Sequence, residues 1–177
     1  ELVREAMRIT GVKGGVEITT IADIPSRGTG LGSSSAVTVG LLSALYEYTD
    51  RKIDSLSLAE QACQIEIDIL GQPIGRQDQF GCAVGGVNHI RFLQDGTTVV
   101  EPLEMSEEMI QRMSEEFTLL YTGKTRSANE LLTKQSENTS ERMVQLDRMC
   151  EQAREVRDAL LAGHFSQVGE LLNEGWE

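Results

Sequence analysis

The sequence predicts an α+β protein of two domains. Strand-like and helical segments are mixed through the first hundred residues, whereas the chain after Thr125 is almost wholly helical. A glycine-rich stretch at residues 25–36 separates a strand-like run from an apolar helix. At 177 residues and 40% hydrophobic composition, the chain can fill one ordinary core or two small ones. We expect a boundary near residues 102–106, with one domain at 1–104 and a second at 105–177.

Two elements are expected before the glycine-rich stretch. Residues 1–10 have the pattern of a helix that ends at Gly11, since glycine favours the left-handed conformation found after a helix. Residues 15–24 are expected to form a strand with Val16 and Ile18 on one face.

Three helices are expected between the glycine-rich stretch and residue 85. Residues 36–48 form a mostly buried apolar helix. The spacing Ser57-x-x-Glu60 matches a capping box that opens a helix to about Leu70. Residues 77–84 form a short segment of helical character.

The remaining chain is expected to contain a hairpin, one further strand and a helical tail. Residues 94–96 supply the turn of the hairpin, and Ser106 can cap a helix that follows it. Gly163 separates the last two helices. The expected ranges are 87–92 and 97–101 for the hairpin strands, 107–115 for the capped helix, 117–121 for a short strand, and 127–134, 141–162 and 166–172 for the tail.

The glycine-rich stretch predicts a phosphate-binding loop. Gly28, Gly30 and Gly32 let backbone N–H groups approach a ligand, and the helix that follows presents its positive end to an anion. A Walker loop is excluded because no Lys precedes Ser33. A dinucleotide fingerprint fits poorly, because Ser33 replaces the third glycine and Pro25 interrupts the strand. A tight turn into a helix, without a ligand, remains an alternative.

Charge and cysteine content exclude several classes of protein. Lys and Arg total 16 against 28 Asp and Glu, so the net charge of −12 disfavours nucleic acid and anionic membranes as partners. No apolar run approaches the roughly 20 residues of a membrane span. Three widely spaced cysteines argue against a disulfide framework or a zinc cluster, and favour a reducing cytoplasm.

Three motifs, in order, resemble the GHMP kinases, which phosphorylate sugars, mevalonate and related alcohols. They are Pro-Ser-Arg-Gly-Thr-Gly-Leu-Gly-Ser-Ser-Ser at 25–35, Gly-Gln-Pro-Ile-Gly-Arg-Gln-Asp-Gln-Phe at 71–80 and Tyr-Thr-Gly-Lys-Thr-Arg-Ser-Ala at 121–128. Together they are most similar to the branch that acts on D-glycero-D-manno-heptose 7-phosphate. The resemblance implies a GHMP-kinase-like two-domain fold. It also implies truncation at both termini, because the family's first and third motifs fall outside residues 1–177.

The same resemblance implies two cofactors, ATP and Mg²⁺, and roles for particular residues. Ser34 and Glu66 would hold the metal, although Glu66 could instead lie on a solvated helix face. Asp78 would be the catalytic carboxylate, or else part of a charged surface loop. The residues assigned to ATP are Gly28, Gly30, Leu31, Gly32, Ser33, Ser34 and Ser35.

The substrate residues follow from the second and third motifs. Arg76 could bind substrate or keep Asp78 ionised, and Gln77, with Gln79, could contact sugar hydroxyls. Thr125 and Arg126 lie where a second phosphate could be bound, since arginine grips phosphate by two parallel hydrogen bonds; Arg126 could also be an ordinary residue at a helix start.

These roles predict a kinase that phosphorylates the anomeric hydroxyl of a heptose 7-phosphate. The partner is therefore a small sugar or sugar phosphate. Two alternatives stay open: a GHMP kinase for fucose or galactose, and a nucleotide-binding module without catalysis.

Overall fold

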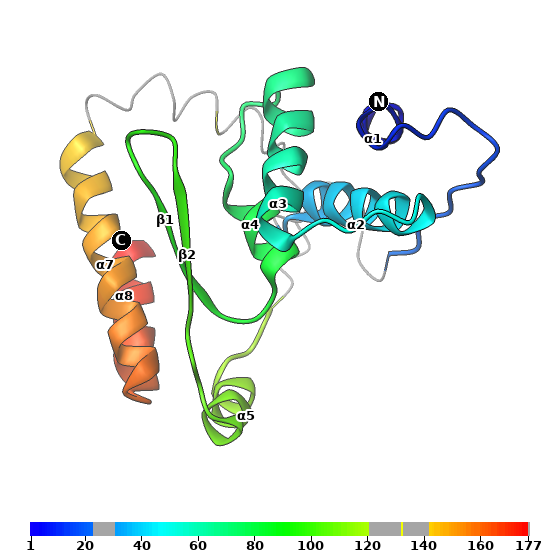
Figure 1. The fold of residues 1–177 in the computed structure, drawn as a ribbon. Helices are drawn as coiled ribbons and strands as arrows, with labels where there is room; N and C mark the ends of the chain where they lie inside the picture. The colour runs from blue at the N-terminus through cyan, green and yellow to red at the C-terminus, as the bar shows by residue number, and fades with distance from the viewer. Residues whose placement is uncertain (23–30, 121–131, 133–141, 177) are drawn as a thin grey trace. The chain divides into compact units, whose positions relative to one another are not determined.

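The computed structural model describes residues 1–22, 31–120, 132 and 142–176. These residues fall into two compact units, one within 1–85 and the other within 86–120 and 142–176 (Figure 1). The units divide in the sequence at Gly85, earlier than the boundary expected near residue 104. A compact unit need not coincide with a family domain, so the division into 1–104 and 105–177 stays a prediction.

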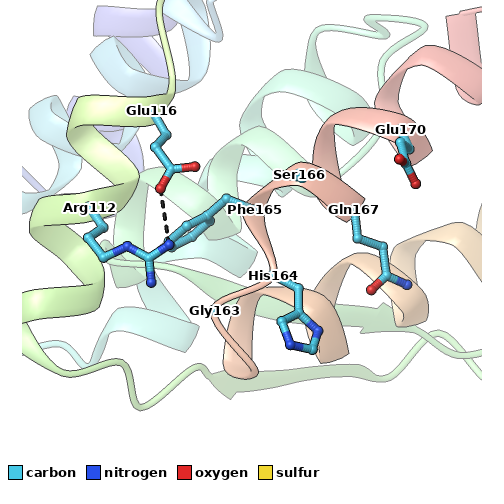
Figure 2. A pocket seen from close by; sticks show the side chains of 8 residues that line it. All are labelled: Arg112, Glu116, Gly163, His164, Phe165, Ser166, Gln167 and Glu170. Carbon is cyan, nitrogen blue, oxygen red and sulfur yellow. Dashed lines mark hydrogen bonds and ion pairs between the residues drawn. The ribbon is translucent and has the colours of Figure 1, made fainter.

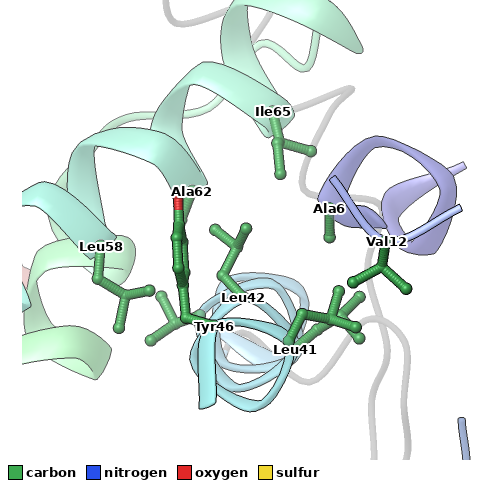
Figure 3. Close-up of a cluster of buried hydrophobic side chains, with 10 residues drawn as sticks. Ala6, Val12, Leu41, Leu42, Tyr46, Leu58, Ala62 and Ile65 are labelled. Carbon is green, nitrogen blue, oxygen red and sulfur yellow. The ribbon is translucent and has the colours of Figure 1, made fainter. Parts of the chain in front are cut away.

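The first unit is built around helix α2. Its neighbours α1, α3 and α4 all pack against it. One cluster of apolar side chains from α1, α2, α3 and η1 forms the core, as Figure 3 shows for Leu42, Tyr46 and Ile65. The elements are α1 (Leu2–Thr10), α2 (Ser33–Tyr48), α3 (Ser55–Cys63), the π-helix η1 (Gln64–Ile69) and α4 (Gln77–Val84).

The helix ends in this unit follow local chemistry. Gly11 adopts a φ of +76° and ends α1 as expected. Helix α3 begins two residues before Ser57, so the predicted capping box is wrong. The cap is the Asp54 carboxylate, which accepts a hydrogen bond from the Ser57 N–H at 2.9 Å and another from the Ser57 hydroxyl at 2.6 Å. These two bonds lower the pKa of Asp54.

The strand expected over residues 15–24 is not found in the part that the structure describes, residues 15–22. Val16 and Ile18 nevertheless lie on the same side of the segment, as expected. They are half-buried against the core cluster, while Glu17 and Thr19 are exposed. Alternation places side chains on one side of an extended segment, but a strand also needs a hydrogen-bonded neighbour. The sheet found among the described residues consists of β1 and β2 alone.

The second unit contains the predicted hairpin and three helices. Strands β1 (Asn88–Phe92) and β2 (Thr98–Pro102) pair antiparallel, with Ile90 opposite Val100. Ser106 caps α5 by accepting a hydrogen bond from the Met109 N–H at 3.2 Å, as predicted. The helices are α5 (Glu107–Glu116), α7 (Met143–Leu161) and α8 (Phe165–Trp176).

Gly163, with a φ of +70°, separates α7 and α8 as the sequence predicts. The strand expected at 117–121 is wrong for residues 117–120, which have no regular structure. Leu119 and Leu120 are about four-fifths exposed, so their apolar run marks no buried strand. The helix expected over 127–134 lies almost wholly outside the described residues. In the described chain, no helix combines the length and apolar character that a bilayer crossing needs.

Candidate active site

The described part of the predicted phosphate loop begins at Leu31 and runs directly into α2. Gly32 is the residue before the helix and has a φ of +63°, a conformation that glycine adopts without strain. Because glycine has no side chain, it cannot cap the first N–H groups of α2, where an anion is favoured. Ser34 is exposed there, Ser33 is half-buried and Ser35 is buried. Gly28 and Gly30 lie outside the described residues.

Asp78 lies against this helix start. A Cβ built on Gly32 would be 3.3 Å from both Cγ and Oδ2 of the Asp78 carboxyl group. The first turn of α4 therefore brings the exposed Asp78 carboxylate to the start of α2, although Gly32 and Asp78 are 46 positions apart in the sequence. Two residues proposed from separate motifs are thus neighbours in the structure, and glycine leaves the space that Asp78 occupies.

Glu66 lies behind this pair and is buried, with 1% of its surface exposed. The alternative that Glu66 belongs to a solvated helix face is therefore wrong. Its Oε1 accepts a hydrogen bond from the Thr38 hydroxyl at 2.9 Å, and its Oε2 accepts one from the Ser35 hydroxyl at 2.9 Å. The Gln79 amide also donates to Oε2. A buried carboxylate is costly unless donors of this kind surround it.

The backbone around Glu66 is unusual. The helix expected to reach Leu70 does so, but its last part, η1, is a π-helix in which the Leu70 N–H donates to the Ile65 carbonyl at 3.0 Å. Single π turns inside helices are frequent at functional sites. This wider turn carries Glu66.

Sequence reasoning missed the partners of Glu66. Thr38 was not proposed at all, although it is a polar residue on an otherwise apolar helix. Gln79 was proposed to contact a sugar, whereas the structure buries it completely and bonds it to Glu66. Among residues 33–35, it is the Ser35 hydroxyl that donates to Glu66. The Ser34 backbone carbonyl accepts a hydrogen bond from the Thr38 hydroxyl.

Arg76 is the residue before α4, and its side chain contacts α3. Its guanidinium pairs with the Glu60 carboxylate and lies 5.4 Å from the centre of the Phe80 ring. It also bonds to the Cys63 thiol, whose pKa is raised by burial. These contacts anchor α4 to α3 and give no support to Arg76 as the cation that keeps Asp78 ionised. Gln77 is exposed at the start of α4.

The donor set fits a magnesium ion held jointly with phosphate oxygens. Mg²⁺ prefers hard oxygen ligands and is commonly bound through one or two carboxylates together with waters and substrate phosphates. The described residues contain no cluster of three or more His, Cys, Asp or Glu that could hold a metal alone. Glu66 Oε1 accepts one hydrogen bond, from Thr38, and so keeps capacity for a further ligand. Thr125 and Arg126 lie outside the described residues.

A concavity is found in the other unit, at the start of α8. Figure 2 shows Arg112, Phe165 and Gln167 among its lining residues. The Arg112 guanidinium pairs with Glu116 at 3.1 Å and lies 4.9 Å from the centre of the Phe165 ring. The Arg112 guanidinium is thus bound by neighbouring side chains, and these contacts pack α5 against α8.

Comparison with known proteins agrees with the motifs. Residues 1–86 match the family model described as the GHMP kinases N terminal domain. These residues are a GHMP-kinase N-terminal domain. The predicted resemblance to the GHMP kinases is confirmed.

Relatives extend the likeness beyond residue 86. The chain is 28% identical over 159 residues to the D-glycero-alpha-D-manno-heptose 7-phosphate kinase of Campylobacter jejuni, covering 89% of this chain and 47% of that protein. It is 29% identical over 199 residues to the galactokinase of Pyrococcus furiosus, covering 97% of this chain and 53% of that protein.

A solved structure shows the fold. The chain is similar to a D-glycero-D-manno-heptose 1-phosphate kinase from Bacteriodes thetaiotaomicron, with a TM-score of 0.76, 28% identity, and coverage of 99% of this chain and 53% of that one. The α+β class and the GHMP-kinase fold are therefore confirmed. The chain spans about half the length of the relatives it matches.

Proposed function

We propose that the protein is an ATP-dependent sugar kinase that phosphorylates the anomeric hydroxyl of a heptose 7-phosphate. Its products would be the 1,7-bisphosphate and ADP. The observation that carries the proposal is the Asp78 carboxylate beside Gly32, at the start of α2. Phosphoryl transfer requires an anion-binding surface and a group that orients the attacking hydroxyl. The start of α2 would supply the first and the adjacent Asp78 carboxylate the second.

ATP would place its phosphates at the loop of residues 28–35. The first turn of α2 offers N–H groups and the positive end of the helix dipole, which attract anions even in a chain with a net charge of −12. The exposed Ser34 hydroxyl adds a donor at the same turn. Gly28 and Gly30, which have no Cβ, would let the backbone approach the phosphates closely, and Leu31 would contribute its backbone to the same loop.

Ser34 and Glu66 would hold Mg²⁺, as the sequence motifs imply. When bound, the ion neutralises charge on the phosphate oxygens during transfer. The buried donors Ser35 and Thr38 hold the Glu66 carboxylate in one orientation, so the side chain offers a preset oxygen.

Asp78 would orient the sugar hydroxyl and take its proton. The hydroxyl oxygen forms a bond to the γ-phosphorus, the bond from that phosphorus to the bridging oxygen breaks, and ADP leaves with the electron pair. The proton passes to the Asp78 carboxylate late in the transfer. General-base assistance of this kind contributes roughly 10²–10⁴-fold to a rate.

Thr125 and Arg126 would contact a phosphate of the sugar, and Gln77 a sugar hydroxyl. The segment at 122–127 carries two cations and three hydroxyls, which suits a second anion. Related proteins named as kinases of heptose 7-phosphate and heptose 1-phosphate support a sugar phosphate as substrate. We assign Arg76 to the anchoring of α4, because its guanidinium engages Glu60.

A fucose or galactose kinase is the second candidate. A galactokinase covers 97% of the chain at 29% identity, and a fucokinase/fucose-1-phosphate guanylyltransferase of Bacteroides fragilis covers 92% at 28%. Free galactose and fucose lack the phosphate that Arg126 would bind. Turnover of a free sugar equal to that of heptose 7-phosphate would therefore favour this candidate.

The deciding experiment is an assay of ADP release by the full-length protein, with free and 7-phosphorylated heptose, galactose and fucose. In the same assay we expect Asp78→Asn to lower kcat by about 10²–10⁴-fold while ATP binding is unchanged. Asp68→Asn is the matched control, since Asp68 is also exposed and lies on η1. Equal losses of turnover and ATP binding in Asp78→Asn would contradict the catalytic role.

A further inference from the structure

One buried carboxylate joins three helical elements of the first unit. Glu66, on η1, accepts hydrogen bonds from Ser35 and Thr38 on α2 and from Gln79 on α4. Helix α2 carries the phosphate-binding turn, and α4 carries Asp78. The network therefore connects the two helices whose first turns meet at Gly32.

Gln79 is the least expected member of this network. Its side chain is completely buried, and its amide nitrogen donates to Glu66 Oε2. Its amide oxygen is also buried and has no hydrogen-bond partner among the described residues. Reversing the amide would turn that oxygen toward the carboxylate and remove the donor, so the orientation is set by Glu66.

An unpartnered buried acceptor destabilises a fold, and an apolar side chain of similar volume would not carry one. Packing alone therefore gives no reason for an amide at this position. What the amide supplies is a donor to one particular oxygen of a buried carboxylate.

The position of Gln79 in α4 adds a second consequence. Asp78 and Gln79 are consecutive in the first turn, so their side chains leave the helix about 100° apart. Asp78 is exposed and lies against Gly32, while Gln79 faces Glu66. A rotation of α4 that displaced one of these side chains would displace the other.

We propose that Gln79 is a positioning residue, which orients the Glu66 carboxylate for the metal ion and holds α4 so that Asp78 faces the phosphate-binding turn. This inference rests on the proposed kinase function. Gln79 touches neither nucleotide nor sugar and acts through Glu66. Groups that orient a metal ligand in this way commonly change metal affinity or activity by 10–100-fold when removed.

The test compares Gln79→Met with Gln61→Met. Both replace a glutamine in the first unit by an apolar side chain of similar length. Gln61 lies on α3, is half-buried and accepts a hydrogen bond from the Tyr46 hydroxyl at 2.8 Å, so Gln61→Met loses a side-chain hydrogen bond that does not involve Glu66. Both variants are first shown to be folded by circular dichroism and thermal unfolding.

The main readout is Mn²⁺ binding to the full-length protein in the presence of an ATP analogue with a non-hydrolysable β–γ bond, followed by electron paramagnetic resonance. We expect Gln79→Met to weaken Mn²⁺ binding about tenfold and Gln61→Met to leave it unchanged. In kinase assays, Gln79→Met should lower kcat, require more Mg²⁺ for half-maximal rate, and keep the KM for the sugar.

The outcomes separate this inference from the proposed function. Wild-type binding of Mn²⁺ by a folded Gln79→Met variant would overturn the positioning role and leave the kinase proposal intact. A wild-type protein that binds no Mn²⁺ with the analogue and releases no ADP would overturn both. Equal weakening in Gln79→Met and Gln61→Met would also overturn the inference, because it would reflect general destabilisation.

Discussion

The two compact units place their charged groups in opposite surroundings. In the first unit, the Glu66 carboxylate is buried and accepts hydrogen bonds from three neutral donors. In the second, Arg148 on α7 forms ion pairs of 2.8 Å with Glu155 and Glu174 at the surface. Hydrogen bonding from Arg148 lowers the pKa of Glu174. Among the described residues, the Glu66 carboxylate is therefore held by neutral donors in a buried place, whereas the Arg148 guanidinium is held by carboxylates at the surface.

The difference separates a functional arrangement from a supporting one. Exposed ion pairs gain little because water already solvates both partners and salt screens them. A buried carboxylate without a cation is costly, and hydroxyl and amide donors offset that cost only in part. The energetically demanding group lies beside the first turns of α2 and α4, where the proposed chemistry takes place.

Among variants that leave the proposed catalytic and metal-binding side chains in place, the largest effect is expected from Gly32→Ala. An alanine at this position would have to adopt the left-handed φ of +63°, and its Cβ would lie 3.3 Å from the Asp78 carboxyl group. The strain costs about 1–2 kcal/mol, and the displacement of Asp78 should lower kcat about 100-fold. Unfolding in urea and ADP release measure the two effects.

Gly11→Ala is the matched control for Gly32→Ala. Gly11 has a φ of +76°, but a Cβ there would meet no atom within 4 Å. It should show a similar loss of stability with unchanged kcat. A Gly32→Ala enzyme as active as Gly11→Ala would mean that the contact between Gly32 and Asp78 is not needed for turnover.

An intermediate effect is expected from Thr38→Val. The change removes a hydrogen bond to a buried carboxylate, and bonds to charged groups contribute about 1.5–3 kcal/mol. Thr10→Val is the matched control, because Thr10 is equally buried but donates to the Ala6 carbonyl within its own helix. It should cost no more than about 1 kcal/mol in the free energy of unfolding. Equal losses would show that Glu66 does not depend on Thr38.

The smallest effect is expected from Arg148→Met in the second unit. The methionine keeps an apolar stem but removes the surface ion pairs with Glu151, Glu155 and Glu174, so stability should fall by less than in Thr38→Val, and kcat should not change. The difference from wild type should shrink in about 1 M NaCl, where screening is strong. A loss larger than that of Thr38→Val would reverse the ranking of the two units.

Local signals in the sequence predicted most of the helices and the hairpin. Gly11 and Gly163 end helices because their conformation suits glycine, and Ser106 caps α5 through a hydrogen bond three residues away. The strand predictions were wrong because a strand also needs a neighbouring strand and a surface to pack against, which the local pattern does not specify. Residues 15–22 show the alternation of a strand without a neighbouring strand, and the apolar residues Leu119 and Leu120 are exposed. The predicted Ser57 cap failed because Asp54 caps the helix earlier.

The sequence by itself predicted a phosphate-binding turn, the family and the candidate carboxylates, because glycine spacing and short motifs can be read directly from the chain. Only the tertiary structure decided which groups meet: Asp78 with Gly32, and Glu66 with Ser35, Thr38 and Gln79. The reason is physical. A buried carboxylate takes its hydrogen bonds from whatever donors packing brings to it, and the packing of α2, η1 and α4 joins residues 13 to 31 positions apart.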